Sequence, residues 1–440
     1  MPERSRRRPP GPPSGSRARA GARAFGEVAR TAGARAFGEV ARAAGARASS
    51  DGTPRQRAPT ASSVGSPLSR VLSSSLALSP DLCSVVSRLA AACARVSSLL
   101  RSGTSPGAPS AQGGRNAFGD AQIAADVAAD AILFEALRGG CSFAASEEQP
   151  EGSRMGAPGS FAVAFDPLDG SSIAQSNLAV GTIAGVWRGD DVRGKTGREL
   201  AAAVVALYGP RTTLWIAVAA NERGRGGAEG GGAKRDGQEG GGGARGQGAA
   251  AGGEGGQEQG SGAPLPPAAI GPDTAVGALE FTLAADPATG AALWSHADEA
   301  EGGDGSFSPG NLGGAWSSPE TRSFVEVCLS RRLKLRYSGG MVPDVLQAIT
   351  SSGGVFFHAP APEQASKLRL AFEVAPLAFL VEAAGGLSRS FGAPSGAAIG
   401  PYEAGSALDV PCASLHQVAD VCLGSREEVE LYAVLLAGRN

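Results

Sequence analysis

The chain has 440 residues, of which 42% are hydrophobic, 66 are glycine and 5% are aromatic. This length allows two or three average domains. The net charge of −2 hides an asymmetry, because residues 1–70 carry 14 arginines against four acidic residues and the remainder is acidic. An acidic folded part argues against nucleic acid as a partner. No apolar stretch is expected to reach the roughly 20 residues of a membrane span, so no membrane association is predicted.

Residues 1–65 are rich in Arg, Ala, Ser, Pro and Gly, and they contain a near-exact tandem repeat that begins at Gly21 and again at Gly33. Such a composition predicts a disordered extension. Because the segment is rich in arginine and poor in acids, we interpret it as an organelle transit peptide. A plain disordered extension, or an incorrectly assigned gene start, is the alternative.

Folded sequence is expected from Ser79 onward. Apolar residues recur at helical spacing from Leu82 to Leu99, which predicts a first helix. Asp120 is a plausible N-cap for a second helix that ends at Gly139. Its buried face is expected to contain five apolar residues, with two acids one turn apart on the polar side: Ile123, Val127, Ala131, Phe134 and Leu137, and Asp126 and Asp130.

Strand-like segments follow at 161–165, 178–187, 201–208, 212–219 and 279–284. Between them, residues 222–266 are mostly Gly, Glu, Gln, Ala and Arg, a composition that cannot bury enough apolar area to fold. We interpret this segment as a disordered insertion between neighbouring strands, with a domain linker as the alternative. Helices expected from Val342 and over 377–384, and a strand after Gly353, complete an α/β layered pattern.

The most informative motif is Asp-Pro-Leu-Asp-Gly-Ser-Ser at 166–172, which follows an apolar strand. Asp166, the Leu168 carbonyl and Asp169 could hold a hard cation, while the N–H groups after them receive a phosphate at a helix start. Other acids beside turns are Glu147, Glu148 and Glu373. Oxygen ligands without His or Cys favour Mg²⁺ or Mn²⁺, which assist phosphoryl transfer to water.

These residues resemble the signature of the fructose-1,6-bisphosphatase family of sugar bisphosphatases. Further segments that resemble the family lie at 117–120, 208–213, 307–311, 335–345 and 367–377. The forms Phe-Ser-Pro-Gly-Asn at 307–311 and Gly-Gly-Met-Val-Pro-Asp-Val at 339–345 are closer to the branch that acts on the seven-carbon sugar. The resemblance implies the layered α-β-α-β-α fold of that family, with a catalytic unit over 79–440 divided into halves 79–290 and 291–440.

The resemblance also implies roles for the site residues. The magnesium ligands would be Glu147, Glu148, Asp166, the Leu168 carbonyl, Asp169 and Glu373. Asp120 and Asp126 match acids of a mobile catalytic loop, and Asp120 with Glu147 would orient and deprotonate the attacking water. The phosphate that is removed would be held by Asp169, Gly170, Ser171, Ser172 and Arg369, whose guanidinium can meet two oxygens at once.

The far phosphate and the sugar would be bound by Asn311, Tyr337 and Lys367, with Gly339 and Met341 shaping the wall. Arg336 matches a residue that reaches into a neighbouring subunit's site, so a homodimer or homotetramer is implied. Each of these residues also has an ordinary structural reading, since a lone tyrosine or methionine is more often core and a lone lysine more often solvated. His358 stands near the position of a family tyrosine that binds the far phosphate, and it could donate to phosphate or be an ordinary surface histidine.

The six cysteines show no metal-binding spacing, so reduced and mostly buried thiols are expected. The loop 102–115 lacks the redox-active cysteine pair that plastid relatives carry there. Cys83 and Cys93 stand ten residues apart in the first expected helix, a span of about 15 Å. Because a disulfide joins Cα atoms within roughly 7 Å, thioredoxin activation through the usual pair is predicted to be absent.

The resemblance therefore implies Mg²⁺-dependent hydrolysis of the 1-phosphate of sedoheptulose 1,7-bisphosphate by direct attack of water, in the Calvin cycle. The implied location is the chloroplast stroma, with the cytoplasm as the alternative. Fructose-1,6-bisphosphatase or dual-specificity activity is the first alternative function. A non-catalytic sugar-phosphate sensor is a more remote one.

Overall fold

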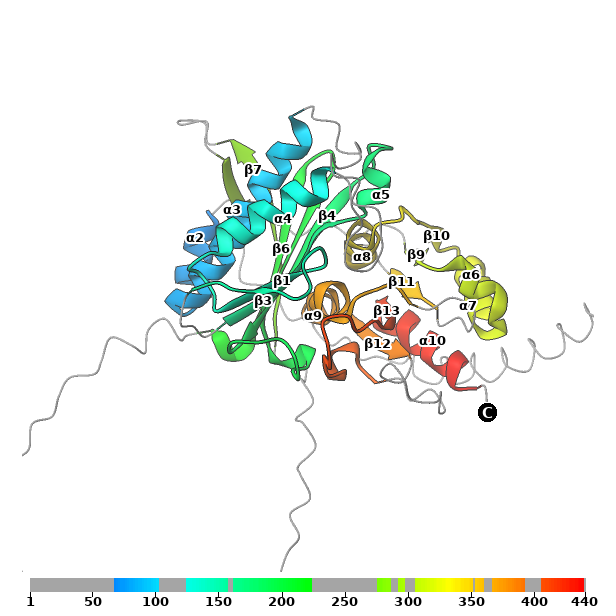
Figure 1. The fold of residues 1–440 in the computed structure, drawn as a ribbon. Coiled ribbons are helices and arrows are strands. Elements are labelled where there is room, and N and C mark those ends of the chain that lie inside the picture. The colour runs from blue at the N-terminus through cyan, green and yellow to red at the C-terminus, as the bar shows by residue number, and fades with distance from the viewer. Residues whose placement is uncertain are drawn as a thin grey trace, which may run out of the picture. The chain divides into compact units, whose positions relative to one another are not determined.

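The computed structural model describes residues 67–102, 124–156, 161–223, 275–285, 292–296, 305–350, 353–359, 366–391 and 405–438. All of them belong to one compact unit, Gln56–Asn440. Figure 1 shows two β-sheets with helices between them and on their outer faces.

The larger sheet has eight strands in the order β2-β1-β3-β4-β5-β6-β7-β8. In that order they are Ser153–Arg154, Phe143–Ser146, Phe161–Asp169, Val180–Arg188, Leu200–Tyr208, Thr212–Ala219, Ala275–Ala285 and Ala292–His296. Strands β1 and β3 run parallel, whereas all the other neighbours are antiparallel. The single parallel pair matters for function, because it brings the carboxyl ends of β1 and β3 to the same edge of the sheet.

The smaller sheet has five strands in the order β10-β9-β11-β13-β12. In that order they are Lys334–Leu335, Ser306–Pro309, Val355–His358, Asp420–Gly424 and Leu387–Phe391. Strands β10, β9 and β11 are parallel, so they also end at one common edge. The antiparallel strands β13 and β12 complete the sheet on the far side.

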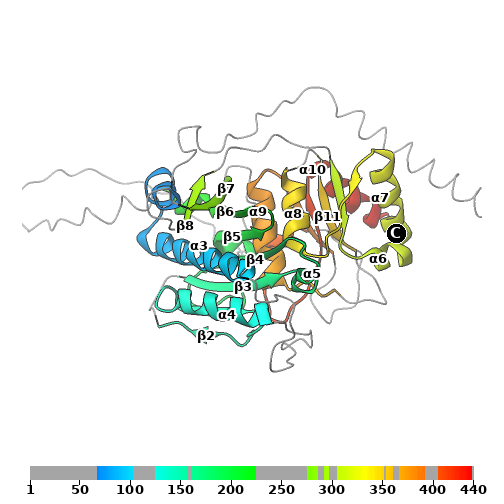
Figure 2. The same cartoon turned by 90° about the horizontal axis from the view of Figure 1, so that it is seen from above.

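Helices form three layers around these two sheets (Figures 1 and 2). Helices α3 (Pro80–Arg101) and α4 (Ala124–Leu137) cover the outer face of the larger sheet, and α8 (Met341–Thr350) and α9 (Ala375–Ala383) pack against strands of both sheets. Helices α7 (Pro319–Ser330) and α10 (Arg426–Ala437) cover the smaller sheet. The layer order α-β-α-β-α that the sequence predicted is therefore confirmed. Shorter elements are α2 (Leu68–Arg70), α5 (Ser171–Ala174), α6 (Leu312–Ser317), 3₁₀ turns at Gly197–Glu199, Ala220–Glu222 and Ala407–Asp409, and π-helical turns at Val71–Ser75 and Leu370–Val374.

Strand β5 shows why both faces of the larger sheet are covered. Its nine residues are Leu-Ala-Ala-Ala-Val-Val-Ala-Leu-Tyr, and nearly all of them are buried. Because successive side chains of a strand point to opposite faces, Val204 joins the hydrophobic cluster under α3 and α4 while Val205 joins the cluster around α8 and α9. A strand that is apolar on both faces is stable only between two helical layers.

Helix α3 begins at a defined cap and is more apolar than we expected. Ser79 accepts a hydrogen bond from the Leu82 N–H at 3.4 Å, and Pro80 occupies the first turn. By length and composition the helix could cross a membrane, with a mean hydropathy of 1.3 over 18 residues, although half of that window is buried in the fold. The expectation that no apolar stretch approaches this length was therefore wrong, because runs of Ala and Val raise the hydropathy of a core helix too.

The fold begins earlier than the predicted start at Ser79. Leu68, Val71, Leu72 and Leu76 are all buried, and they join the cluster beneath α3. The sequence prediction was wrong here because this short stretch is interrupted by Ser and Arg and gives little helical periodicity. Residues 1–65, with the repeat and the proposed transit peptide, lie outside the described residues.

Helix α4 buries a different face from the one predicted. Asp126 and Asp130 are 3% and 4% exposed, whereas Val127 is 43% exposed. The prediction placed these acids on the solvated side. It was wrong because α4 contains six alanines among fourteen residues, so its apolar pattern has no dominant direction and polar contacts decide which side faces inward.

The structure corrects the predicted end of strand β3 and shows how β6 pairs with β7. Strand β3 does not end at Phe165 but continues to Asp169, with an irregular register between Asp166 and Asp169. Strands β6 and β7 are antiparallel neighbours, with Ala219 opposite Ala275. The predicted insertion 222–266 lies outside the described residues from 224 onward, but its predicted start was wrong, because Glu222 is 1% exposed in the 3₁₀ turn after β6. The strands before and after it, β6 and β7, are neighbours in one sheet.

Candidate functional site

The parallel register of β1 and β3 places two acids side by side. Ser146 at the end of β1 lies opposite Phe165 of β3, and the Glu147 N–H donates to the Phe165 carbonyl at 3.1 Å. The residue after each of these partners is an acid, namely Glu147 and Asp166. Both carboxylates therefore stand at the same edge of the sheet.

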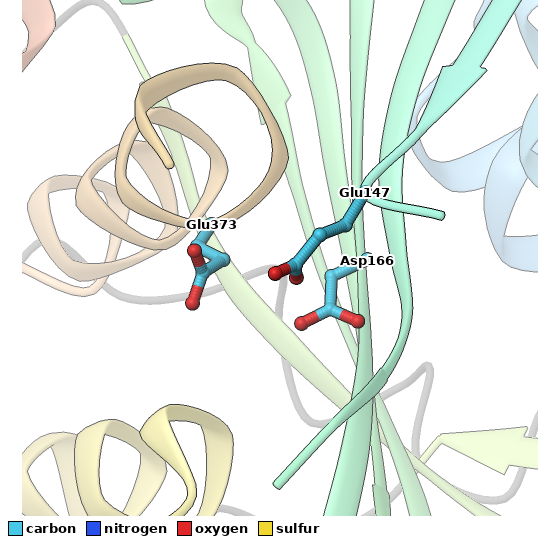
Figure 3. Close-up of side chains that lie close together, drawn as sticks. All are labelled: Glu147, Asp166 and Glu373. Carbon is cyan, nitrogen blue, oxygen red and sulfur yellow. The ribbon is translucent and has the colours of Figure 1, made fainter. Parts of the chain in front are cut away.

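A third acid faces them from the helical layer between the sheets. Glu373 belongs to the π-helical turn Leu370–Val374, which packs on β3 and β4. One carboxylate oxygen from each of Glu147, Asp166 and Glu373 lies within 4.8 Å of the other two. Figure 3 shows the three side chains converging from separate segments.

Burial and mutual repulsion both act on these carboxylates. Burial raises the pKa of Asp166 well above its usual range, and the negative charges of Glu147, Asp169 and Glu373 raise it further. The pKa of Glu373 is also raised well above its usual range, by burial and then by the charge of Glu147. Without a counter-ion this cluster favours protonation, so it is a place where a cation would be strongly stabilised.

The donor set of the cluster fits a hard divalent cation. All three ligand groups offer oxygen, which suits Mg²⁺ or Mn²⁺. Opposite oxygens around octahedral Mg²⁺ are about 4.2 Å apart, so an oxygen group within 4.8 Å would need little contraction to bind one ion. Of the described acids, Glu148 and Asp169 were also predicted as ligands, but the structure does not place them in this close group.

Asp169 is directed at the start of α8. Its two oxygens accept hydrogen bonds from the N–H groups of Met341 at 2.9 Å and Val342 at 2.6 Å. Burial raises the pKa of Asp169 to about 6 even though these two N–H groups lower it. In this structure the carboxylate therefore joins the larger sheet to the helix that carries the predicted sugar-binding wall.

Buried hydrogen bonds fix the backbone of the turn. The Leu168 N–H donates to Asp166 Oδ1 at 2.9 Å, and the Thr182 hydroxyl donates to the Pro167 carbonyl at 2.8 Å. The Tyr208 hydroxyl lies 2.8 Å from that of Thr182. Leu168 is buried in the core beneath, so the turn is held from below by both polar and apolar contacts.

Gly170 shows why a glycine follows Asp169. Its φ of 79° is in the left-handed region, and an added Cβ would stand 3.1 Å from the Gly340 Cα. Only glycine meets both conditions without strain. Ser171 begins α5 directly afterwards, and Ser172 is exposed, so the predicted phosphate contacts of 170–172 stand at the rim of the turn.

Arg369 contacts two members of the acid group. Its backbone N–H donates to Glu373 Oε2 at 2.5 Å, and its guanidinium lies 3.7 Å from Glu147 Oε1. The guanidinium also donates to the Lys367 carbonyl. The side chain is only 6% exposed, so a buried positive charge lies beside the carboxylates, where a phosphate would approach.

The residues predicted for the far phosphate and sugar lie on the smaller sheet and the loops after it. Asn311 is buried, and its amide donates to the Ala359 carbonyl at 3.4 Å. Arg336, Tyr337 and Lys367 are exposed, Tyr337 to 54%. Met341 is buried at the start of α8, and Gly339 has a φ of 97° in the preceding loop. Their substrate contacts stay predictions.

The predicted catalytic-loop acids divide between the described and undescribed parts of the chain. Asp120 lies outside the described residues. Asp126 is buried on α4, as described above. His358, at the end of β11, is 7% exposed, and its Nδ1 lies 2.9 Å from Asp420 Oδ1. It is therefore a buried partner of a carboxylate and not an ordinary surface histidine.

Cysteines in the described part of the chain are free thiols, including Cys83 and Cys93 on the single helix α3. Cys83 is partly exposed and the other five are buried. Burial raises the pKa of Cys93 to about 12, which keeps it as an unreactive thiol. Most of the loop 102–115 lies outside the described residues.

Sequence reasoning missed several residues that support the site. Asp344 is 2% exposed and accepts the Ser338 N–H at 3.0 Å, which holds the loop before α8. Thr182 supports the turn from β4. Asp344 follows Pro343 at the predicted helix start, where an acid is favoured by the helix dipole, but the pairing of Thr182 with Pro167 has no signal in the sequence.

Two family profiles match the chain. Residues 72–226 match "Fructose-1-6-bisphosphatase, N-terminal domain" and residues 302–437 match "Fructose-1-6-bisphosphatase, C-terminal domain". The chloroplastic sedoheptulose-1,7-bisphosphatase of Chlamydomonas reinhardtii is 37% identical over 73% of this chain and 66% of the algal protein. The chain thus spans just under two thirds of that relative's length. The class 1 fructose-1,6-bisphosphatase of Pelobacter propionicus is 31% identical over 72% of this chain and 77% of its own length.

Solved structures agree with these sequence matches. A Toxoplasma gondii crystal structure, provisionally named as a sedoheptulose-1,7 bisphosphatase, has a TM-score of 0.62 and 27% identity, covering 85% of this chain and 99% of the other. The holo fructose-1,6-bisphosphatase of Leishmania major has a TM-score of 0.61 at 23% identity over 84% and 98% of the two chains, which shows the common fold. The resemblance inferred from the motifs is confirmed, and the chain belongs to the fructose-1,6-bisphosphatase family.

Proposed function

We propose that this protein hydrolyses the 1-phosphate of sedoheptulose 1,7-bisphosphate in a reaction that depends on Mg²⁺, with Mn²⁺ able to substitute. One observation carries the proposal above all others. Carboxylate oxygens of Glu147, Asp166 and Glu373 gather within 4.8 Å beside the turn that ends in Gly170 and Ser171.

In this proposal Glu147, Asp166 and Glu373 hold the divalent cations, with Glu148, Asp169 and the Leu168 carbonyl as further ligands. When bound, such ions would neutralise negative charge and lower the pKa of water. The protein's own groups do the remaining work. Arg369 and the N–H groups after Asp169 grip the phosphate oxygens, and Glu147 with Asp120 accepts the proton of the attacking water.

A direct attack by water is preferred to a phosphorylated enzyme intermediate. Neither a cysteine nor a histidine belongs to the described acid group, whose three members are carboxylates. Ser171 and Ser172 already have a proposed role in holding phosphate through their backbone. Trapping of a covalent phosphoenzyme during turnover would contradict this mechanism.

Two arguments favour the seven-carbon substrate: the sequence identity to relatives named after it, and the residues proposed to bind the far phosphate. Relatives named sedoheptulose-1,7-bisphosphatase are 36–37% identical, against 30–31% for those named fructose-1,6-bisphosphatase. Asn311, Tyr337 and Lys367 would hold the far phosphate and sugar. Fructose 1,6-bisphosphate is the second candidate substrate, because the two bisphosphates differ by one hydroxylated carbon, which also changes the distance between their phosphates.

The proposed setting follows from the same relatives. Those of Chlamydomonas reinhardtii, Triticum aestivum and Spinacia oleracea are described as chloroplastic, which supports a role in the Calvin cycle of the chloroplast stroma. The Arg-rich residues 1–65 would serve as the transit peptide. We further propose a homo-oligomer in which the exposed Arg336 reaches the site of a neighbouring copy.

The test is phosphate release by the purified protein from each bisphosphate, with Mg²⁺ and with EDTA. We expect release from sedoheptulose 1,7-bisphosphate only with the metal, and a higher kcat/KM than for the fructose compound. Glu147→Ala should abolish release. Absence of release from both bisphosphates, together with tight sugar-phosphate binding that Glu147→Ala leaves intact, would instead favour the non-catalytic sensor.

A further inference from the structure

Helix α4 carries a buried acid, Asp130, that the mechanism proposed above does not use. Asp130 is 4% exposed, one turn beyond Asp126 on the same inward face of the helix. Burying a carboxylate is unfavourable unless it gains partners. The partners of Asp130 therefore indicate what the acid is retained for.

Asp130 reaches the loop that carries the predicted metal ligands. The Gln149 side-chain amide donates to Asp130 Oδ2. The other oxygen, Oδ1, is buried without a hydrogen bond of ordinary geometry, although the Ser146 hydroxyl is near enough to lower the pKa of the acid. Ser146 and Gln149 are the residues that stand immediately before and after the pair Glu147 and Glu148.

The same two residues close the loop on itself. The Gln149 N–H donates to Ser146 Oγ at 2.9 Å, and the Ser146 N–H and Gln149 carbonyl are 3.3 Å apart. The Gly152 N–H donates to the Gln149 carbonyl at 3.0 Å. Glu147 thus lies inside a small ring of backbone hydrogen bonds, and Asp130 is the contact that fastens this ring to α4.

We propose that Asp130 is a positioning residue for the divalent-cation site. Through Gln149 it holds the 146–149 loop against α4, so that the Glu147 carboxylate stays within reach of Asp166 and Glu373. The inference rests on the proposed function in taking these three acids to be cation ligands. A group that orients ligands in this way typically changes metal affinity or activity by about 10–100-fold when it is removed.

The protonation state of Asp130 does not decide the proposal. Burial raises the pKa of this acid, and hydrogen bonds from Ser146 and Gln149 lower it. Oδ2 accepts from the Gln149 amide whether the carboxyl is ionised or carries its proton on the other oxygen. What matters is that the α4 side chain offers an acceptor and residue 149 offers a donor.

Calorimetric titration of the full-length protein with Mn²⁺, without substrate, measures the cation site directly. We expect Asp130→Ala to raise the Mn²⁺ Kd about tenfold, and Gln149→Ala to do the same. The double variant should be no worse than either single variant, since both remove one contact. Asp130→Asn should stay near the wild-type Kd, because its amide oxygen still accepts from Gln149.

An exchange of donor and acceptor makes the test specific. Gln149→Glu alone sets two carboxylates against each other and should weaken Mn²⁺ binding at least as much as Gln149→Ala. Adding Asp130→Asn makes residue 130 the hydrogen-bond donor and residue 149 the acceptor. This pair should recover the Mn²⁺ Kd to within about threefold of the wild type. A role limited to filling space would show no such recovery, so failure of the exchange would overturn the proposal.

A matched control separates positioning from general stability. Thr321 is fully buried on α7, and its hydroxyl lies 2.9 Å from that of Tyr432. Thr321→Val should lower the Tm but leave the Mn²⁺ Kd unchanged. If the wild type binds Mn²⁺ and Asp130→Ala binds it equally well, the positioning proposal is wrong. If the wild type itself binds no Mn²⁺ and releases no phosphate, it is the proposed function that fails.

Discussion

The two sides of the candidate site differ in how firmly they are built. On the larger sheet, Asp166 and Asp169 are 5% and 7% exposed, and their carboxylates accept hydrogen bonds from backbone N–H groups. On the smaller sheet, Tyr337 is 54% exposed and Lys367 is also exposed. The acids that would hold the metal are buried and hydrogen-bonded, whereas Tyr337 and Lys367, which would contact the sugar and its far phosphate, face solvent.

This difference has a physical reason. Acids that share a cation must keep their spacing to within a few tenths of an ångström, so they need buried, hydrogen-bonded support. A residue that recognises the far end of a substrate gains its contacts only when the substrate is bound. Substitutions on the first side should therefore affect both stability and catalysis, and those on the second side should affect mainly substrate binding.

The largest effect is expected from Asp166→Asn. Loss of one negative charge from the acid group should lower kcat by about 10²–10³-fold, the range found when one electrostatic contact to a transition state is removed. The metal-free protein should at the same time become more stable, because burial and three neighbouring charges disfavour the ionised Asp166. Phosphate-release kinetics and thermal unfolding in EDTA measure both. A variant with normal kcat would remove Asp166 from the proposed mechanism.

Arg369→Lys should come next. Lysine keeps the charge but loses the forked geometry, and the guanidinium is buried near Glu147. One lost charge-assisted hydrogen bond is worth about 1.5–3 kcal/mol, so we expect kcat/KM to fall by about 10–100-fold. The matched control is Arg426→Lys on α10, an exposed arginine with no proposed role in the site. An equal loss with this variant would show that the effect does not report on the candidate site.

The pH dependence of stability tests the acid side without any substrate. Burial raises the pKa of Asp169 and of Asp344 to about 6, above their value of about 3.9 in an unfolded chain. The folded state then binds more protons than the unfolded state, so the free energy of unfolding of metal-free protein should fall as pH rises from about 4 through 6. Each group would contribute roughly 3 kcal/mol.

Divalent cations should reverse this trend, since they replace the protons on the acid group. Mg²⁺ is therefore expected to raise the Tm more at pH 8 than at pH 5. The measurement is a series of thermal unfolding curves with Mg²⁺ or EDTA at each pH. A Tm in EDTA that increases steadily from pH 4 to pH 7 would contradict the buried, charge-crowded acid group.

The smallest effect is expected on the exposed side. Tyr337→Ala should raise the KM for the bisphosphate by about tenfold, the cost of one lost hydrogen bond and ring contact, with kcat and Tm nearly unchanged. Leu335→Ala, an equally exposed neighbour at 52%, is the matched control and should change neither. A large drop in kcat for Tyr337→Ala would instead give this residue a role in the reaction itself.

Much of the layered fold and the convergence of the acids could be predicted from the sequence. Asp166 was placed from the apolar strand that begins at Phe161, whereas strand β1 before Glu147 was not predicted and Glu147 was assigned from the order of the motifs and the family resemblance. Glu373 could be placed because Pro376 indicated a helix start just beyond it. These predictions succeeded where strong local patterns, apolar strands and a proline, coincided with the residues of interest.

The inward face of α4 could not be predicted, because its alanines fit either orientation and the decision depends on Gln149, nineteen residues away. The early start of the fold at residues 67–78 was missed for a similar reason. Leu68 and Leu76 become core only through contact with α3 and the sheet. Long-range polar contacts and short apolar segments carry little signal in a single sequence.

The pairing of Ala219 with Ala275 across β6 and β7 has an evolutionary consequence. Because β6 and β7 are hydrogen-bonded to each other, the two ends of the chain between them stay together whatever its length. Each doubling of that length adds only about 0.6 kcal/mol to the entropic cost of closing the loop. The gene can therefore lengthen or shorten at this point by replication slippage with little selection against the change.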